Sequence, residues 1–107
     1  MAITKRNSVD VNQREIVEAL RAKGYYVVVQ SQVGGGVPDL LVGVPHYKMT
    51  GNGQGAWVLF EVKHPMRQRL TKAQVAFFRD CNQYGLPCYK VTSFAECEEI
   101  LAAIEES

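Results

Sequence analysis

The chain has 107 residues, which is enough for one domain with a single hydrophobic core. Its formal net charge of +1 excludes a strongly basic or acidic protein, so a nucleic-acid-binding surface must come from local clusters of cations. The sequence has no apolar segment long enough for a membrane span and no signal peptide, and its three cysteines lack metal-ligand spacing. We therefore expect a cytoplasmic protein with reduced cysteines.

The first predicted element is a helix. Residues 1–9 are polar, and we expect them to be flexible. Asp10 can cap a helix that runs to Lys23, because Gln13 stands at the position of a capping partner. Gly24 then supplies the stop.

Two strands follow this helix. The β-branched and aromatic run 25–30 predicts the first of them. Three consecutive glycines then permit a tight turn or a close backbone approach, and Pro38 and Asp39 open the second strand, 40–44. Taken alone, Asp39 is better explained as a turn or capping residue.

The third predicted strand, 56–63, has the sequence AWVLFEVK, whose continuous apolar character is typical of a strand covered on both faces. Because side chains alternate along a strand, Glu61 and Lys63 emerge side by side at its end. A charged pair there must be solvated, paired or bound to a metal. The turn-rich connection 45–55 makes this strand a neighbour of the previous one, so Asp39 and Glu61 lie on adjacent strands.

After a basic turn, HPMRQRL, the chain alternates helix, strand and helix. The second helix is predicted over 71–84, where Thr71 and Gln74 fit a capping box. A short strand over 87–91 and a last helix over 93–104 complete the chain. The element order predicts an α/β domain with a mixed central sheet and helices on both of its faces.

The residues Asp39, Glu61 and Lys63 together indicate a chemistry. Two carboxylates on neighbouring strands repel each other unless a cation lies between them, and Mg²⁺ binds one or two carboxylates while keeping several waters. The backbone carbonyl of Val62 is suited to be a further oxygen ligand. A lysine on the same face can orient an attacking water or stabilise the transition state by its charge. The set suits metal-assisted hydrolysis of a phosphodiester bond.

The ordered motifs GGGVPDLLVG, WVLFEVK and LTKAQ resemble those of the PD-(D/E)XK nuclease superfamily. Within it, the chain is most similar to the small stand-alone VRR-NUC-type nucleases of bacteria and phages, relatives of Holliday-junction resolvases. The resemblance implies one nuclease domain over 1–107 with a restriction-endonuclease-like αβββαβ core, and DNA cleavage that depends on Mg²⁺ or Mn²⁺. Asp39 and Glu61 would then bind the metal, and Lys63 would be the catalytic lysine.

The resemblance also implies a wider set of site residues and partners. Many relatives place a glutamate of the metal shell on the first helix, where this chain offers Gln13 or Glu15. Further positions would support the metal ligands or contact DNA: Gln74, Gly35, Gly36, Arg67, Arg69 and Lys72. We expect branched DNA as the substrate, a homodimer because symmetric cutting requires two sites, and the cytoplasm of a bacterium or a phage-infected cell as the location.

Two other hypotheses stay open. The absence of a first-helix glutamate at Gln13 is compatible with a nucleic-acid-binding module that has a vestigial, inactive site. Such a module would bind nucleic acid in a salt-sensitive way without turnover. In a purely structural interpretation, Asp39 caps a turn and Glu61 pairs with Lys63, and the triple glycine and the basic turn then remain unexplained.

Overall fold

The computed structural model describes residues 5–51 and 53–107. Its elements, in chain order, are α1 (Lys5–Ala22), β1 (Tyr26–Val29), β2 (Leu40–Val44), the short 3-10 helix η1 (His46–Lys48), β3 (Ala56–Val62), α2 (Lys72–Tyr84), β4 (Cys88–Val91) and α3 (Phe94–Glu105). None of the helices in the described ranges has the length and apolar character needed to cross a membrane.

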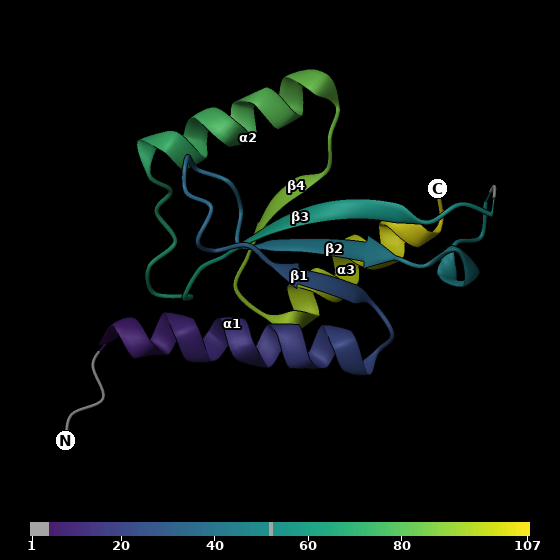
Figure 1. Cartoon of the computed structure of the whole chain (residues 1–107), viewed down its shortest axis with the longest axis horizontal. Coiled ribbons are helices and arrows are strands. Elements are labelled where there is room, and N and C mark those ends of the chain that lie inside the picture. Colours follow the sequence, from purple (N-terminus) through teal and green to yellow (C-terminus); the bar gives the residue numbers. More distant parts are fainter. Residues whose placement is uncertain (1–4, 52) are drawn as a thin grey trace.

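The four strands form one sheet in the order β1-β2-β3-β4 (Figure 1). β1 pairs with β2, and β2 with β3, in antiparallel fashion, whereas β3 and β4 are parallel. The register sets Leu40 opposite Phe60 and Glu61 opposite Lys90. The predicted mixed sheet is thereby confirmed. Asp39 directly precedes Leu40, the β2 residue that pairs with Phe60 of β3.

A single hydrophobic core lies between one face of the sheet and two helices. α1 and α3 lie in contact with each other and bury their apolar stripes against this face, and α2 lies on the opposite side of the sheet (Figure 1). Alternating side chains of each central strand supply the core, as the period of 2 predicts. The core comprises Ile16, Val17, Leu20, Val27, Leu40, Val42, Val44, Val58, Phe60, Val62, Val91, Cys97 and Leu101.

The first helix begins earlier than the sequence predicts. α1 starts at Lys5, so the predicted helix start at Asp10 is wrong; residues 1–4 lie outside the described range. Asp10 is inside the helix and is not its cap. The physical reason is that neither glycine nor proline interrupts residues 5–9, so the capping preference of Asp10 alone does not stop the helix.

The capping box of α2 is confirmed, since the Thr71 hydroxyl accepts a hydrogen bond from the Gln74 backbone and the Gln74 side chain accepts one from the Thr71 backbone. At the other end Gly85 adopts the left-handed conformation at a φ of 67° and stops the helix. The first turn of α2 lies beside the end of β3, because the Gln74 side chain is hydrogen-bonded to Glu61 and Lys63.

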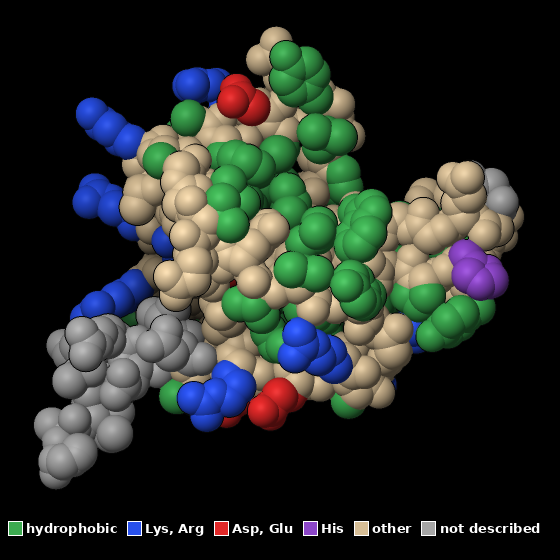
Figure 2. Space-filling model, viewed as in Figure 1, with side chains coloured by type: hydrophobic (Ala, Val, Ile, Leu, Met, Phe, Trp, Pro, Cys, Tyr) green, Lys and Arg blue, Asp and Glu red, His purple; other side chains and the backbone are tan. Residues whose placement is uncertain are grey.

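The second face of the sheet is only partly covered, contrary to the expectation for β3. Trp57 keeps 54 % of its surface exposed and Tyr26 keeps 63 %, and their rings meet edge to face at a centroid distance of 6.0 Å. The indole lies over Gly43, where an added Cβ would come within 3.1 Å of it. Figure 2 shows hydrophobic side chains gathered on this face. Helix α2 therefore covers the end of β3 that carries Glu61 and leaves the beginning of the strand open.

Candidate functional site

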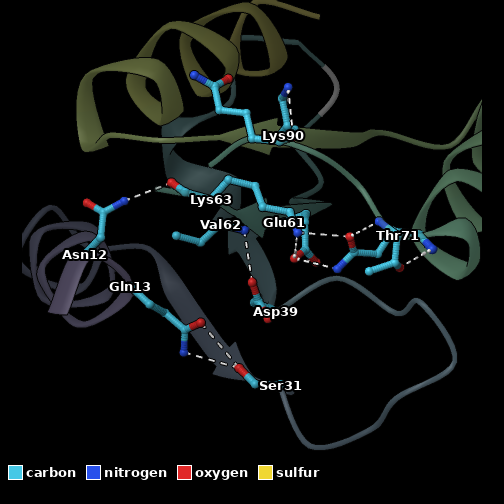
Figure 3. Close-up of polar contacts among 11 residues, drawn as sticks. Asn12, Gln13, Ser31, Asp39, Glu61, Val62, Lys63, Thr71 and Lys90 are labelled. Carbon is cyan, nitrogen blue, oxygen red and sulfur yellow. Dashed lines mark hydrogen bonds and ion pairs between the residues drawn. The ribbon is translucent and has the colours of Figure 1, made fainter. Parts of the chain in front are cut away.

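A cleft of about 580 Å³ opens where β2 begins and β3 ends, between α1 and the segment that leads into α2 (Figure 3). Three of the residues that line it, Asp39, Glu61 and Lys63, are the candidate catalytic residues. The complete lining is Gln13, Val29, Ser31, Gln32, Asp39, Glu61, Val62, Lys63, Arg67 and Arg69. The structure thus brings together residues from five separate segments of the chain in one concave surface.

Asp39 is held by the strand next to it. Its Oδ2 accepts a hydrogen bond of 3.0 Å from the backbone N–H of Val62. In an extended strand the N–H and the C=O of one residue point to the same side, so the Val62 carbonyl also points toward Asp39. A carboxylate oxygen and a backbone oxygen therefore face the same part of the cleft, as the expected ligand set requires.

Glu61 is a buried carboxyl group with an unsatisfied oxygen. Only 4 % of the residue is exposed. Its Oε2 accepts a hydrogen bond of 2.9 Å from the Gln74 side chain, whereas its Oε1 is buried without a hydrogen-bond partner among the described residues. Desolvation by burial, followed by the negative charge of Asp39, raises the pKa of Glu61 to about 7, although the Lys63 ammonium acts in the opposite direction.

A divalent cation fits this arrangement. An unpaired buried oxygen is costly, and a cation between Glu61 and Asp39 would satisfy it and remove the repulsion that raises the Glu61 pKa. Within 5–51 and 53–107, no cluster of three or more His, Cys, Asp or Glu side chains is placed to hold a metal. Two carboxylates and the Val62 carbonyl, with water completing the shell, match the needs of Mg²⁺ rather than those of Zn²⁺.

Lys63 points along the same side of the sheet as Glu61. Its Nζ donates to Gln74 Oε1 at 3.0 Å and lies 3.7 Å from Glu61 Oε2. Only 15 % of the Lys63 side chain is exposed, so the ammonium is directed into the site rather than into bulk solvent. The Gln74 carboxamide contacts both charged groups at once and fixes the distance between them.

The glycine-rich loop packs directly against the first turn of α2. A Cβ built on Gly36 would lie 2.3 Å from the Ala73 carbonyl oxygen and 2.9 Å from the Gln74 backbone nitrogen, and Gly36 has a φ of +81°. Gly35 has a φ of +65°, but a Cβ there would meet nothing within 4 Å. Gly36 therefore supports the site by letting the loop before Asp39 touch α2, whereas Gly35 serves only the backbone turn.

These two glycines allow a matched prediction. Gly35→Ala is expected to cost about 1–2 kcal/mol of unfolding free energy, because it places a side chain on a left-handed residue. Gly36→Ala has the same backbone cost and also displaces α2, so it is expected to cost more than about 3 kcal/mol. Urea unfolding of both variants measures the difference. Equal losses would show that the loop and α2 do not depend on their close approach.

The first helix brings an amide to the cleft, not an acid. Gln13 lines the cleft, and its side chain is hydrogen-bonded to Ser31, with Nε2 and Oγ 3.2 Å apart. Glu15 is exposed and is not among the lining residues. The reason is geometric, because two residues along an α-helix turn by about 200°, so Gln13 and Glu15 point in nearly opposite directions. Of the two expected first-helix ligands, only Gln13 has the right position.

Arg67 and Arg69 line the outer part of the cleft, and Lys72 is exposed at the first position of α2. The segment before them is tightly turned, since Arg67 donates its backbone N–H to the carbonyl of His64 at 2.8 Å. In Figure 2 lysine and arginine side chains gather along the edge formed by the segment between β3 and α2. This cationic rim next to two carboxylates is suited to a substrate that carries phosphates.

Residues that the sequence did not indicate also contribute to the site. Ser31 and Gln32 line the cleft from the loop after β1. Asn12 donates hydrogen bonds to the backbone at the ends of β3 and β4. Asparagine and serine are ordinary on a helix and in a loop, so no sequence pattern distinguishes them; only the tertiary fold brings them to the strand ends.

Comparison with known proteins adds no assignment, since no protein-family model, curated protein or solved structure matches this chain. The proposed function of this α/β domain therefore depends on the geometry and chemistry of the cleft.

Proposed function

We propose that the protein is a metal-dependent endodeoxyribonuclease of the PD-(D/E)XK type, in which Asp39, Glu61 and the Val62 carbonyl hold Mg²⁺ or Mn²⁺. The observation that carries the proposal is the buried, unpaired oxygen of Glu61 beside Asp39. The element order αβββαβ, with two antiparallel strand pairs and one parallel pair, supports a restriction-endonuclease-like core. The ordered motifs that end in EVK support the same family.

The residues of the chain divide the work of phosphodiester hydrolysis. A bound Mg²⁺ supplies Lewis-acid stabilisation of the phosphate charge and acidifies water. The Lys63 ammonium, held at 3.0 Å from Gln74, is placed to orient the attacking water and to stabilise charge on the reacting phosphate. Arg67 and Arg69 bind neighbouring phosphates at the rim of the cleft and so place the scissile bond over the two carboxylates.

We propose branched DNA as the substrate and a homodimer as the working form, located in the cytoplasm of a bacterial or phage-infected cell. Cleavage of both strands at a junction requires two sites, and one small protomer offers only one. The three cysteines Cys81, Cys88 and Cys97 are free thiols, which suits a reducing compartment.

The uncovered sheet face supports the dimer. A groove of about 580 Å³ on it is lined by Tyr26, Trp57 and neighbouring residues, and no lysine, arginine, aspartate or glutamate is among these lining residues. Without cations such a groove does not suit DNA phosphates, whereas an identical uncharged face on a second copy would match it. The groove is on the part of β3 that precedes the candidate site, so this contact leaves the cationic rim free.

We expect Trp57→Glu to shift the protein from dimer to monomer, because the new carboxylate would face its own symmetry mate in an apolar contact. Sedimentation velocity over a range of concentrations measures the shift. Tyr84→Glu, which changes a 74 % exposed tyrosine at the end of α2, is the control and should leave the association unchanged. A wild type that remains monomeric at high concentration would contradict the homodimer.

The test of the nuclease proposal is cleavage of labelled four-way junction, flap and linear duplex DNA with Mg²⁺ or Mn²⁺, compared with EDTA and with Asp39→Asn. We expect cutting that requires the metal, favours branched DNA and is lost in Asp39→Asn. Calorimetric titration with Mn²⁺ accompanies the assay, because Asp39→Asn should also weaken metal binding. Folded, metal-loaded wild-type protein that cuts none of these substrates would refute the enzyme.

One observation favours the second candidate function, a catalytically inactive nucleic-acid-binding module. Gln13 occupies the first-helix position in the cleft and contributes no charge to a metal shell. Such a module would bind DNA through Arg67 and Arg69 with steep salt dependence and without turnover. Gln13→Glu discriminates the two: it should tighten Mn²⁺ binding in a metalloenzyme and weaken DNA binding in a module that holds no metal.

A further inference from the structure

The first helix is tied to the end of the sheet that carries the candidate site. The Asn12 carboxamide donates two hydrogen bonds of 3.0 Å, one to the carbonyl oxygen of Lys63 and one to that of Thr92. These carbonyls directly follow β3 and β4, and Asn12 is separated from them by 51 and 80 positions in the sequence. Figure 3 shows the Asn12 side chain reaching from α1 to the Lys63 backbone. One side chain therefore joins three elements of the fold.

The two carbonyls need this partner because the ladder between the parallel strands ends there. The last strand pair is Val62 with Val91, and the Lys63 N–H donates to the Val91 carbonyl at 2.9 Å. Beyond this point no further backbone hydrogen bond joins the two segments in the part of the chain that the structure describes. The carboxamide of Asn12 has two N–H groups, and each satisfies one carbonyl that the ladder leaves over.

The same contacts fix the backbone from which the site residues extend. The Val62 N–H is held by Asp39, the Lys63 N–H by Val91, and the Lys63 carbonyl by Asn12. The peptide group between Val62 and Lys63 contains the carbonyl proposed as a metal ligand, and it lies between these anchors. Of the anchors, Asn12 is the only one in α1.

We propose that Asn12 is a positioning residue: by holding the Lys63 carbonyl, it sets the direction in which the Val62 carbonyl and the Lys63 ammonium enter the cleft. This inference rests on the proposed nuclease function. The first helix, which brings the uncharged Gln13 to the cleft, then serves the reaction through the backbone of β3 rather than through a carboxylate.

Asn12→Ala is expected to lower kcat for DNA cleavage by about 10- to 100-fold, the usual effect of removing a group that orients a catalytic or metal-binding residue. KM should change by less than about 2-fold, because the rim arginines that bind phosphate remain in place. Val17→Ala is the matched control, since it removes a buried side chain of the same helix without touching the site. It should lower Tm at least as much as Asn12→Ala and leave kcat unchanged at a temperature well below either Tm.

Asn12→Gln provides the rescue experiment, because it retains both N–H donors on a longer side chain and should recover part of the lost kcat. If Asn12→Ala does not fold, Asn12→Gln is compared directly with wild type, and a lower kcat with unchanged KM is again expected. NMR adds a readout that is independent of turnover, since Asn12→Ala should shift the amide resonances of Val62 and Lys63.

Active wild type with an equally active, folded Asn12→Ala would overturn the inference and leave the nuclease proposal intact. Inactive wild type with every metal and DNA tested would overturn both, and the wild-type assay alone distinguishes this outcome. A fall in kcat that Val17→Ala reproduces would show that Asn12 acts only on stability, which also overturns the inference.

Discussion

Replacing Lys63 with alanine is expected to lower kcat for DNA cleavage by about 10²- to 10³-fold, the range seen when one stabilising group is removed from the reacting centre. The Lys63 ammonium is 3.7 Å from Glu61 and 3.0 Å from Gln74, and 15 % of its side chain is exposed. In the proposed nuclease it would therefore act in the chemical step and contribute little surface for initial DNA binding. Single-turnover kinetics at saturating enzyme measures the loss.

Lys72→Ala is the matched control for Lys63→Ala. Lys72 is a lysine in the same basic region, but it is exposed on the first turn of α2. Its replacement should weaken DNA binding with kcat unchanged. The slope of the logarithm of the binding constant against the logarithm of the salt concentration should become shallower by about 1. If both variants lose affinity and neither loses kcat, Lys63 is a phosphate-binding residue and the catalytic assignment is wrong.

Replacing Glu61 with glutamine is expected to stabilise the metal-free protein at pH 8. Below about pH 4.5 the Glu61 carboxyl is protonated in both states, and between about 4.5 and 7 the unfolded chain releases the proton while the folded protein retains it. Stability is therefore lost as the pH rises through this window, and at pH 8 the buried carboxylate costs about 3 kcal/mol. Glutamine carries no charge and can donate a hydrogen bond toward Asp39.

Urea unfolding in EDTA at pH 4.5 and pH 8 tests this prediction. The two proteins should have similar unfolding free energies at pH 4.5, and Glu61→Gln should be the more stable by about 1–3 kcal/mol at pH 8. Added Mn²⁺ should raise the Tm of wild type at pH 8 and have little effect on the variant, since ligand binding stabilises only a protein that can bind it. A variant that is less stable than wild type at pH 8 would show that Glu61 has a structural role.

Much of the fold follows from local patterns that the tertiary structure does not overrule. The capping box at Thr71 and the stop at Gly85 set the bounds of α2, and the alternation of side chains along β3 places Glu61 and Lys63 on one side of the sheet. The turn-rich segment between β2 and β3 makes these two strands neighbours in the sheet. These features depend on residues close in sequence, where spacing and side-chain type are sufficient.

The parts that the sequence did not predict depend on distant segments. Whether Gln13 or Glu15 faces the cleft depends on how α1 is rotated against the sheet, which the contacts with distant strands determine. The exposure of Trp57 follows from the small area that α2 covers, which no local pattern reveals. The role of Gly36 in packing the loop against α2 likewise depends on a contact with a distant residue, Ala73.

The parallel pairing of β3 with β4 has a consequence for the protein during its synthesis. Asp39, Glu61, Lys63 and Gln74 all emerge from the ribosome before β4, yet the Lys63 backbone is held by Val91 and, through Asn12, is joined to Thr92. Long-range contacts of this kind form only when both segments are present. A nascent chain that already carries every charged group of the candidate site therefore still lacks the strand that fixes Lys63, and the site takes its final geometry only after β4 and Thr92 have been synthesised.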